Sequence, residues 1–313
     1  MIKQLLEIFI FPGFLFLSTI SFIAEYLDRK FYAKLQNRVG PPWFQPLADF
    51  IKLIAKEEII PKDVEPKIFK VLPVIALTSV VTAFMYIPLW NSHALLSFDC
   101  DVIVIIYLLT IPTLTFFLGG WYSTSLYAML GAVRTLTQLF AYEVLLFLSI
   151  LSPALLADSW SLNGIAEFYL SHPLLCLVNI PAFIIAVIAA QGKLEKVPFD
   201  IPEAETEIVA GAFTEYGGRL LAIFRMTIDA ELVVISSLLA CVFLPFGMGH
   251  GFILSFVIYL LKILFMIAVF AIFRTIMARL RIDQMVKLCW RVLAPLAIVQ
   301  IFINLVIKEV LLK

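Results

Sequence analysis

Carboxylates are concentrated in one hydrophilic stretch, GKLEKVPFDIPEAETEIVAGAFTEYGGR, which covers residues 192–219 between two long apolar runs. Six of the 23 acidic residues of the chain fall within it: Glu195, Asp200, Glu203, Glu205, Glu207 and Glu215. If a cavity encloses acids at this density, their pKa values become coupled, which suits them to take up and release protons. An ordinary acidic surface loop would have the same composition.

A short helix is expected inside this stretch, over residues 202–213. It begins at a proline, which is favourable at the first helical position. Glu203 and Glu205 fall in its first turn, where the positive end of the helix dipole stabilises anions. The pair Gly217-Gly218 stops the segment. On such a helix, Glu203 and Glu207 would share a face.

A second set of ionisable residues lies inside the apolar runs, where an uncompensated charge costs several kcal/mol. Glu143 falls close to the middle of its run, and Lys262 could snorkel to an interface or pair. Arg225 and Asp229 are four residues apart and could pair, whereas Glu231 points away from both. Pairing between helices is one interpretation of these residues and a path for protons or ions is the other. Glu143 and Glu231 have no local partner in the sequence.

Charged residues also mark two loops. Residues 44–56 have apolar side chains at helical spacing opposite Asp49, which predicts an amphipathic helix on the inner membrane surface. The turn-rich NRVGPP before it presents Arg38. A plain surface anchor fits this segment, and so does the lining of a cavity beneath a docked partner. Arg279 and Arg281 belong to a charged collar that positive-inside bias explains and that could also hold a soluble subunit.

The chain as a whole is strongly apolar: of its 313 residues, 62% are hydrophobic and 15% charged, and the mean hydropathy is +1.02. Soluble domains are about half apolar and a quarter charged. This composition therefore predicts an all-α polytopic membrane protein with a single integral domain over residues 1–313. Eight membrane helices are expected, at about residues 4–26, 68–90, 102–122, 126–152, 174–191, 219–246, 251–273 and 285–310.

Basic residues indicate the orientation. Lys and Arg number nine over residues 29–70, four over 193–225 and five over 274–291, and the remaining interhelical segments have none. The positive-inside rule therefore predicts a multi-pass protein of the cell (inner) membrane with both termini outside. Three loops are expected in the cytoplasm: residues 28–67 with the amphipathic helix, 192–219 with the acids, and 274–287 with the basic collar.

Several classes of site are not supported. The four cysteines stand more than 40 residues apart and the histidines are scattered, so neither a metal site nor a self-contained iron–sulfur cluster is expected. The chain has no nucleophile and base at useful spacing, so no catalytic residue is predicted. Nothing in the charge pattern indicates nucleic acid. The first apolar run has no small-residue cleavage site and is expected to be a retained helix.

Four blocks of the sequence resemble, in the same order, the signature blocks of the NADH dehydrogenase subunit 1 family: QNRVGPPWFQPLADFIKLIAKE, VRTLTQLFAYE, VPFDIPEAETEIVAGAFTEYGG and RLRIDQMVKLCWRVLAPLA. This family contains the H subunit of bacterial complex I and its counterparts in energy-converting membrane-bound NiFe hydrogenases. The resemblance covers essentially the whole chain. The predicted eight spans with both ends outside agree with that family.

The resemblance implies a membrane anchor for a soluble electron-transfer arm. Its partners would be a large catalytic subunit, a small iron–sulfur subunit and antiporter-like membrane subunits in the lipid bilayer. Iron–sulfur clusters and a NiFe centre would belong to these partners, because the chain has no ligands for them. A quinone is a candidate ligand of the cavity beneath the arm. An acidic path would lead from that cavity into the membrane.

The resemblance also assigns residues by matching motif positions. It implies that the loop acids of the path are Glu203, Glu205, Glu207 and Glu215. It implies that the intramembrane acids are Glu143 and Asp229 or Glu231. Cavity lining or partner docking would fall to Arg29, Arg38, Asp49, Arg134, Asp200, Arg279 and Arg281.

Two departures bear on the branch of the family. Complex I members usually have an Arg and a small residue before Pro-Phe-Asp, whereas this chain has Lys196 and Val197, and Asp-Ile-Pro replaces the commoner Asp-Leu-Pro. The departures favour a hydrogenase-type complex whose cavity need not hold quinone. The expected function is to dock the peripheral arm and link its redox chemistry to proton or sodium translocation.

Three alternatives stay open. The first is the quinone-site subunit of a respiratory dehydrogenase that oxidises NADH or a reduced deazaflavin. The second is a stand-alone ion transporter, although no internal repeat relates the two halves of the chain. The third is an intramembrane enzyme, against which the lack of a nucleophile and base argues.

Overall fold

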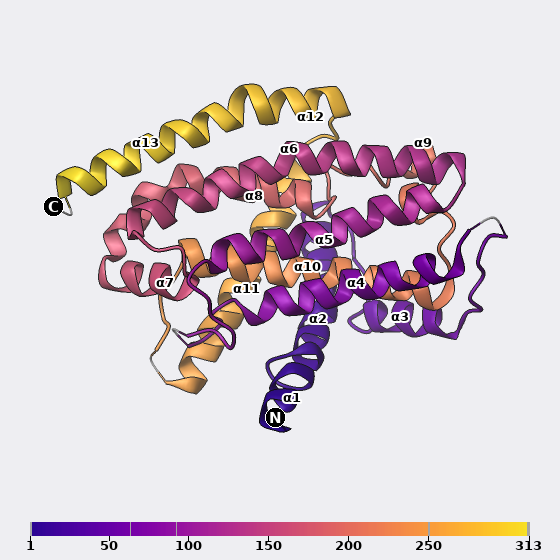
Figure 1. Cartoon of the computed structure of the whole chain (residues 1–313), viewed down its shortest axis with the longest axis horizontal. Coiled ribbons are helices and arrows are strands. Elements are labelled where there is room, and N and C mark those ends of the chain that lie inside the picture. Colours follow the sequence, from indigo (N-terminus) through magenta and orange to yellow (C-terminus); the bar gives the residue numbers. More distant parts are fainter. Residues whose placement is uncertain (1, 63, 92, 250, 312–313) are drawn as a thin grey trace.

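The computed structural model describes residues 2–62, 64–91, 93–249 and 251–311, and every regular element in these ranges is helical. Short 3₁₀ turns at Pro173–Asn179 and Gly211–Phe213 and a π-helical turn at Cys289–Leu293 complete the helical elements. The α-helices (Figure 1) are α1 Ile2–Phe9, α2 Phe14–Leu35, α3 Gln45–Ala55, α4 Pro66–Met85, α5 Asp101–Tyr122, α6 Leu126–Ala157, α7 Leu162–Ser171, α8 Ile180–Lys193, α9 Glu205–Ile208, α10 Gly218–Phe243, α11 Phe252–Ile276, α12 Ile282–Leu288 and α13 Ala294–Leu311.

Eight stretches of the described chain are long and apolar enough to cross a membrane, as predicted. They are Leu6–Leu35, Pro66–Met85, Asp101–Tyr122, Leu126–Ala157, Pro173–Lys193, Gly218–Phe243, Phe252–Ile276 and Ile282–Val310. An even number of spans returns the chain to the side on which it began. Within lipid each helix satisfies its own backbone hydrogen bonds, which is why no strand is needed.

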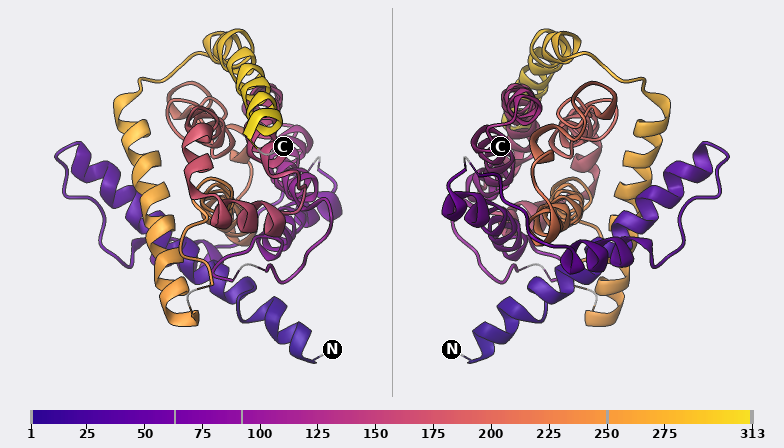
Figure 2. Two further views of the ribbon diagram at one scale, coloured as in Figure 1. Left: turned by 90° about the vertical axis from the view of Figure 1, so that its left-hand side faces the viewer. Right: turned by 90° about the vertical axis from the view of Figure 1, so that its right-hand side faces the viewer.

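The spans do not run parallel. Figure 2 shows α5, α6, α8 and α10 nearly end-on, whereas α2 and α11 lie across the view. The α10 span is the most enclosed of the eight, and it packs against α2, α4 and α11. The α2 and α11 helices also pack against each other, so the two inclined helices form one flank of the bundle.

The first span differs from its prediction at both ends. The chain leaves the helical path between α1 and α2, at Ile10–Gly13, and α2 then continues to Leu35. The helix was predicted to end at the polar residues 28–30, but α2 continues past them to Leu35. Asp28 and Arg29 instead have charged partners on other elements, so their cost inside the helix is offset.

The predicted helix over residues 202–213 was wrong. Only α9 and the 3₁₀ turn form there, because Val209 and Gly211 have φ angles of 61° and 54°, which no right-handed helix accommodates. A Cβ at Gly211 would lie 1.9 Å from the carbonyl oxygen of Pro202, so the segment folds back on itself. Glu203 and Glu207 consequently face different partners rather than one another.

Replacing Gly211 by Ala tests this fold-back. We expect a loss of about 1–3 kcal/mol in the free energy of unfolding, because the left-handed backbone and the contact with Pro202 must both be disturbed. The measurement is thermal unfolding of the purified protein in detergent. Gly217→Ala is the matched control, since φ is −138° there and no atom lies within 4 Å of the added Cβ. Equal unfolding temperatures for both variants would contradict the account.

Candidate functional site

A cavity of about 600 Å³ lies where α2, α3, α10, α11 and the loop after α8 meet. Charged side chains dominate its lining: the acids are Glu25, Asp49, Glu195, Asp200, Glu203 and Asp229, and the bases are Arg29, Lys196, Arg225, Arg274 and Arg279. The numbers of acids and bases nearly balance, so most charges can find a partner.

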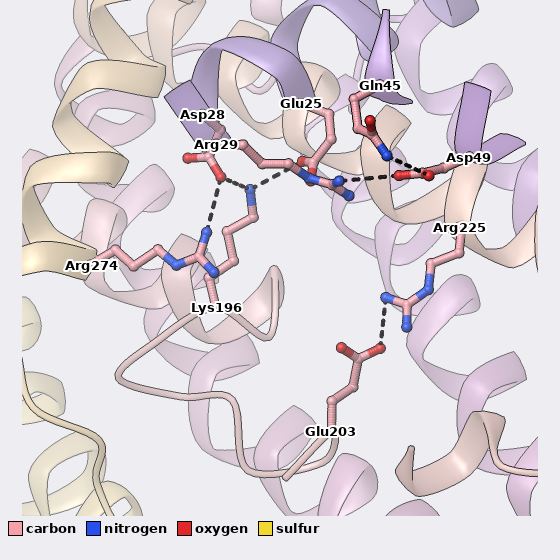
Figure 3. A network of polar contacts seen from close by, with 9 residues as sticks. All are labelled: Glu25, Asp28, Arg29, Gln45, Asp49, Lys196, Glu203, Arg225 and Arg274. Atoms are coloured by element: carbon pink, nitrogen blue, oxygen red, sulfur yellow. Dashed lines mark hydrogen bonds and ion pairs between the residues drawn. The ribbon is translucent and has the colours of Figure 1, made fainter. Parts of the chain in front are cut away.

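One wall is built on Asp28, whose side chain is only 1% exposed. Its Oδ2 accepts a hydrogen bond from Lys196 Nζ at 2.7 Å and another from Arg274 Nη1 at 3.2 Å (Figure 3). Lys196 also lies 3.7 Å from Glu25. These contacts join α2, α11 and the loop after α8 at one point. Burial lowers the pKa of Lys196, but the charges of Asp28 and Glu25 outweigh it and raise that pKa overall, so the ammonium form persists.

The next wall joins α2 to α3. Arg29 donates from Nε to Glu25 at 2.6 Å and from Nη1 to Asp49 at 3.5 Å. Gln45 at the start of α3 donates to the other oxygen of Asp49 at 2.9 Å (Figure 3). The predicted amphipathic helix therefore exists as α3. Its Phe50 faces the cavity, while other apolar side chains of α3 are exposed: Leu47, Ile51 and Ile54.

The facing wall belongs to the acidic loop and α10. Arg225 Nη1 lies 3.2 Å from Glu203, and Arg279 Nε lies 3.0 Å from Asp200. The pairing suggested from sequence between Arg225 and Asp229 is replaced by this contact, because Glu203 is folded back toward α10. Asp229 lines the cavity among charged groups of α2 and the loop.

A separate small hollow of about 20 Å³ adjoins the cavity and shares Glu195 and Glu203 with its lining, and Glu231 also lines it. There Lys193 Nζ lies 2.8 Å from Glu231, and both side chains are 2% exposed. Lys193 also donates to Thr113, which bonds the hydroxyl of Tyr142 at 3.0 Å. Glu231 has no local partner in the sequence, as predicted, and its partner in the structure lies 38 residues away.

Glu195 stands at the entrance to this hollow. Burial raises its pKa to about 8, and the negative charge of Glu203 adds to the rise, while Lys193 partly opposes it. A carboxyl group with that pKa changes its protonation near neutral pH. The sequence placed Glu195 in the acidic stretch but gave no reason to prefer it over its neighbours.

The remaining candidates lie elsewhere. Glu207 pairs with Arg134 at 2.6 Å in a separate hollow of about 330 Å³ that also contains Arg279 and Arg281. The hydrogen bond from Arg134, and then its charge, lower the pKa of Glu207. Arg38, which is exposed, and Glu215, which is half-buried, line neither of these two spaces.

Two further candidates are Glu143 and Glu205. Glu143 is half-buried on α6, and no hydrogen bond or ion pair joins it to the described residues. Glu205 begins α9, but its side chain lies outside the part that the structure describes. Within the described ranges, no three His, Cys, Asp or Glu side chains come together as metal ligands.

Five residues of the site were not among the site residues predicted from the sequence: Glu25, Asp28, Lys193, Lys196 and Arg274. The four-residue spacing of Glu25 and Arg29 was a usable signal, since a Glu four residues before an Arg forms a helical ion pair. The contacts of Asp28 with Lys196 and Arg274 span 168 and 246 residues, which no local pattern reveals.

Comparison with known proteins identifies the family. The sequence model of the NADH dehydrogenase family matches residues 7–305, nearly the whole chain. The chain belongs to the NADH dehydrogenase family. The H subunit of NADH-quinone oxidoreductase from Syntrophotalea carbinolica is 36% identical to it over 93% of both chains. The H subunit from Dehalococcoides mccartyi is 34% identical over 97% of this chain and 86% of its own length.

A solved structure agrees with this family membership. A chain of the membrane-bound sulfane sulfur reductase, an archaeal respiratory membrane complex, superimposes with a TM-score of 0.84 at 26% identity, covering 97% of this chain and 98% of its own. This NADH dehydrogenase family member is thus a multi-pass membrane subunit of a complex I-related assembly, with partners in the membrane and in a peripheral arm.

Lys196→Ala tests the contacts around Asp28. It leaves a buried carboxylate short of one of its two cations, so we expect a loss of about 3–5 kcal/mol in the free energy of unfolding. Lys70→Ala is the control, because Lys70 pairs with Glu58 at 2.7 Å but is half-exposed, and its loss costs about 0–1 kcal/mol. Adding Asp28→Asn to Lys196→Ala should recover much of the stability. A Lys196→Ala protein as stable as the Lys70 control would show that the contacts do not matter.

Glu195→Gln tests the raised pKa. An acid whose pKa rises from 4.5 to about 8 on folding binds more protons in the folded state between those values. Its contribution to stability is therefore favourable below about pH 4.5 and declines as pH rises toward 8. Between pH 5 and 9, the unfolding temperature of the parent should fall more steeply with rising pH than that of Glu195→Gln. Parallel pH profiles for the two proteins would rule out the assignment.

Proposed function

We propose that this subunit docks the peripheral electron-transfer arm and couples its redox chemistry to proton or sodium translocation. One observation supports the proposal above the others. Glu195 and Glu203 line both the charged cavity and the small hollow that contains the ion pair of Lys193 and Glu231, two residues of the membrane spans. Buried ionisable groups in membrane proteins are costly and commonly mark ion paths.

Coupling would act through the loop after α8. A change of charge in the docked arm alters the protonation of Glu195 and the pairing of Glu203 with Arg225. Both acids line the hollow that ends at Glu231, so a change at either shifts the electrostatic balance of the Lys193 pair. Glu143, on the neighbouring α6, would receive the change next and pass it to antiporter-like subunits.

The arm would dock on the surface around the cavity mouth. Arg279 and Arg281, together with Arg134 and Glu207, line the second hollow beside it. Trp43 and Val39, in the loop before α3, are 75% and 87% exposed, which suits contact with another protein or with lipid headgroups. The docked partners would be a large catalytic subunit and a small iron–sulfur subunit, which would hold the clusters.

The charged lining favours the hydrogenase-type branch of the family. Sites for small organic ligands are mostly apolar with a few placed polar groups, whereas eleven charged residues line this cavity. Lys196, which departs from the complex I pattern, lines the cavity and is held there by Asp28 and Glu25. The alternative is the quinone-site subunit of a respiratory dehydrogenase, which the NADH-quinone oxidoreductase relatives favour.

Glu143→Gln tests coupling. The variant keeps the size of the side chain but cannot carry its charge, so we expect redox turnover to continue while ion uptake into inverted vesicles falls at least tenfold. Glu167→Gln is the control, since Glu167 is 55% exposed and lies outside the membrane spans. Co-purification of partner subunits verifies assembly. Ion uptake equal to that of the control would refute the path.

The composition of the purified complex distinguishes the hydrogenase-type branch of the family from the dehydrogenase branch. A co-purifying large subunit with four nickel-binding cysteines would support the hydrogenase type, and bound quinone with no such subunit would support the dehydrogenase. A subunit that transports ions alone, without iron–sulfur partners, would refute both.

A further inference from the structure

A second cavity, of about 370 Å³, lies at the other end of α11 from the charged cavity. It includes Phe252 at the start of α11, whereas the charged cavity includes Arg274 near the end of that helix. One wall is the end of α1 and the break between α1 and α2, with Glu7, Phe11 and Pro12. The facing wall is the end of α4 and the loop that follows it.

The floor of this cavity is aromatic and apolar. Phe84 and Ile87 are buried, and Trp90 is 6% exposed. Phe11 stacks on Trp90 with 5.3 Å between ring centroids, and Phe252 meets the same indole edge-on at 5.9 Å. Phe11 and Phe252 are themselves largely exposed, so the apolar space is open to the surroundings of the bundle at its side.

The rim of the cavity is polar. Asn91 and His93 follow α4 closely, and both side chains are exposed. An amide and an imidazole supply N–H donors. His93 Nε2 lies 4.0 Å from Glu167 of α7, and both side chains are exposed. The cavity therefore has an apolar floor and hydrogen-bond donors at one border.

The position of this cavity in the membrane agrees with its apolar floor and polar rim. The α4 span ends at Met85 and the α11 span begins at Phe252, so the cavity lies where the hydrocarbon gives way to headgroups. Aromatic side chains concentrate at this depth in membrane proteins. The abundant molecules at this depth with an apolar end and an anionic end are phospholipids.

We propose that this cavity binds one phospholipid, with an acyl chain on the aromatic floor and phosphate or ester oxygens facing Asn91 and His93. Lipid tails are as apolar as the wall, so the hydrophobic effect does not distinguish a bound lipid from its neighbours. Close packing against the rings and hydrogen bonds at the rim provide the selectivity. The site is independent of the proposed coupling function.

A groove on α13 provides the comparison. It has a similar volume, about 330 Å³, but its lining is entirely aliphatic or aromatic: Val299, Phe302, Ile303, Val306 and Ile307. Without a polar rim, it can hold a tail only by packing. A lipid there should exchange freely during purification.

Ala94→Trp tests the site by filling the cavity, and Ile303→Trp fills the α13 groove as a matched control. The measurement is native mass spectrometry of the complex purified in mild detergent. We expect the parent and Ile303→Trp to retain a phospholipid that Ala94→Trp has lost. An unchanged lipid count in Ala94→Trp overturns the proposal.

A second measurement covers the case in which Ala94→Trp fails to assemble. The double variant Asn91→Leu, His93→Leu removes the donors without filling the space, and it should lower occupancy by at least fivefold. A photo-crosslinking residue at Leu95 should then capture phospholipid in the parent complex. Capture of a neighbouring protein subunit in place of lipid would assign the cavity to that subunit and end the lipid proposal.

Discussion

The buried carboxylate of Asp28 is the constraint on which the site depends. A carboxylate withdrawn from water is strongly unfavourable unless cations and hydrogen-bond donors surround it. Here the two cations, Lys196 and Arg274, arrive from the loop after α8 and from α11. Oδ2 of Asp28 gains both cations only when α2, α11 and that loop meet, whereas Oδ1 is buried without a hydrogen-bond partner among the described residues. Local electrostatics therefore constrains the relative position of three distant parts of the chain. The cavity is the space that remains beside this junction.

The acidic loop also depends on a local constraint, the fold-back at Gly211. Glu203 is turned toward Arg225 because Gly211 permits a fold-back that a continuous helix would prevent. That turn places Glu195 and Glu203 over the hollow that leads to Lys193 and Glu231. An irregular loop therefore does what a helix could not: it presents carboxylates both to the cavity and to the membrane interior. The exposure of the ion pairs falls from the cavity to the bundle interior, from the half-exposed pairs of Arg29 and Arg225 to the buried pair of Lys193 and Glu231.

Much of this architecture was predictable. Apolar run length identified all eight spans, and apolar side chains at helical spacing identified α3, because the bilayer imposes length and polarity on each segment separately. The acidic stretch was predicted because six carboxylates stand together between two long apolar runs, and three of them line the cavity: Glu195, Asp200 and Glu203. Partners were not predictable: Lys193 and Glu231 meet only through helix packing, and nothing local distinguishes Glu195 from Glu203. The loop was misjudged because local helix signals ignored Val209 and Gly211, whose conformations depend on the fold.

The inclination of α2 has a mechanical consequence. This helix has 22 residues and is about 33 Å long, and it lies obliquely across its neighbours. Its charged end is clamped by Lys196, and its opposite end meets Trp90 through Phe16. A helix of this length is a rigid element. A tilt of α2 would therefore disturb the ion pairs around Asp28 and the ring contact between Phe16 and Trp90 together.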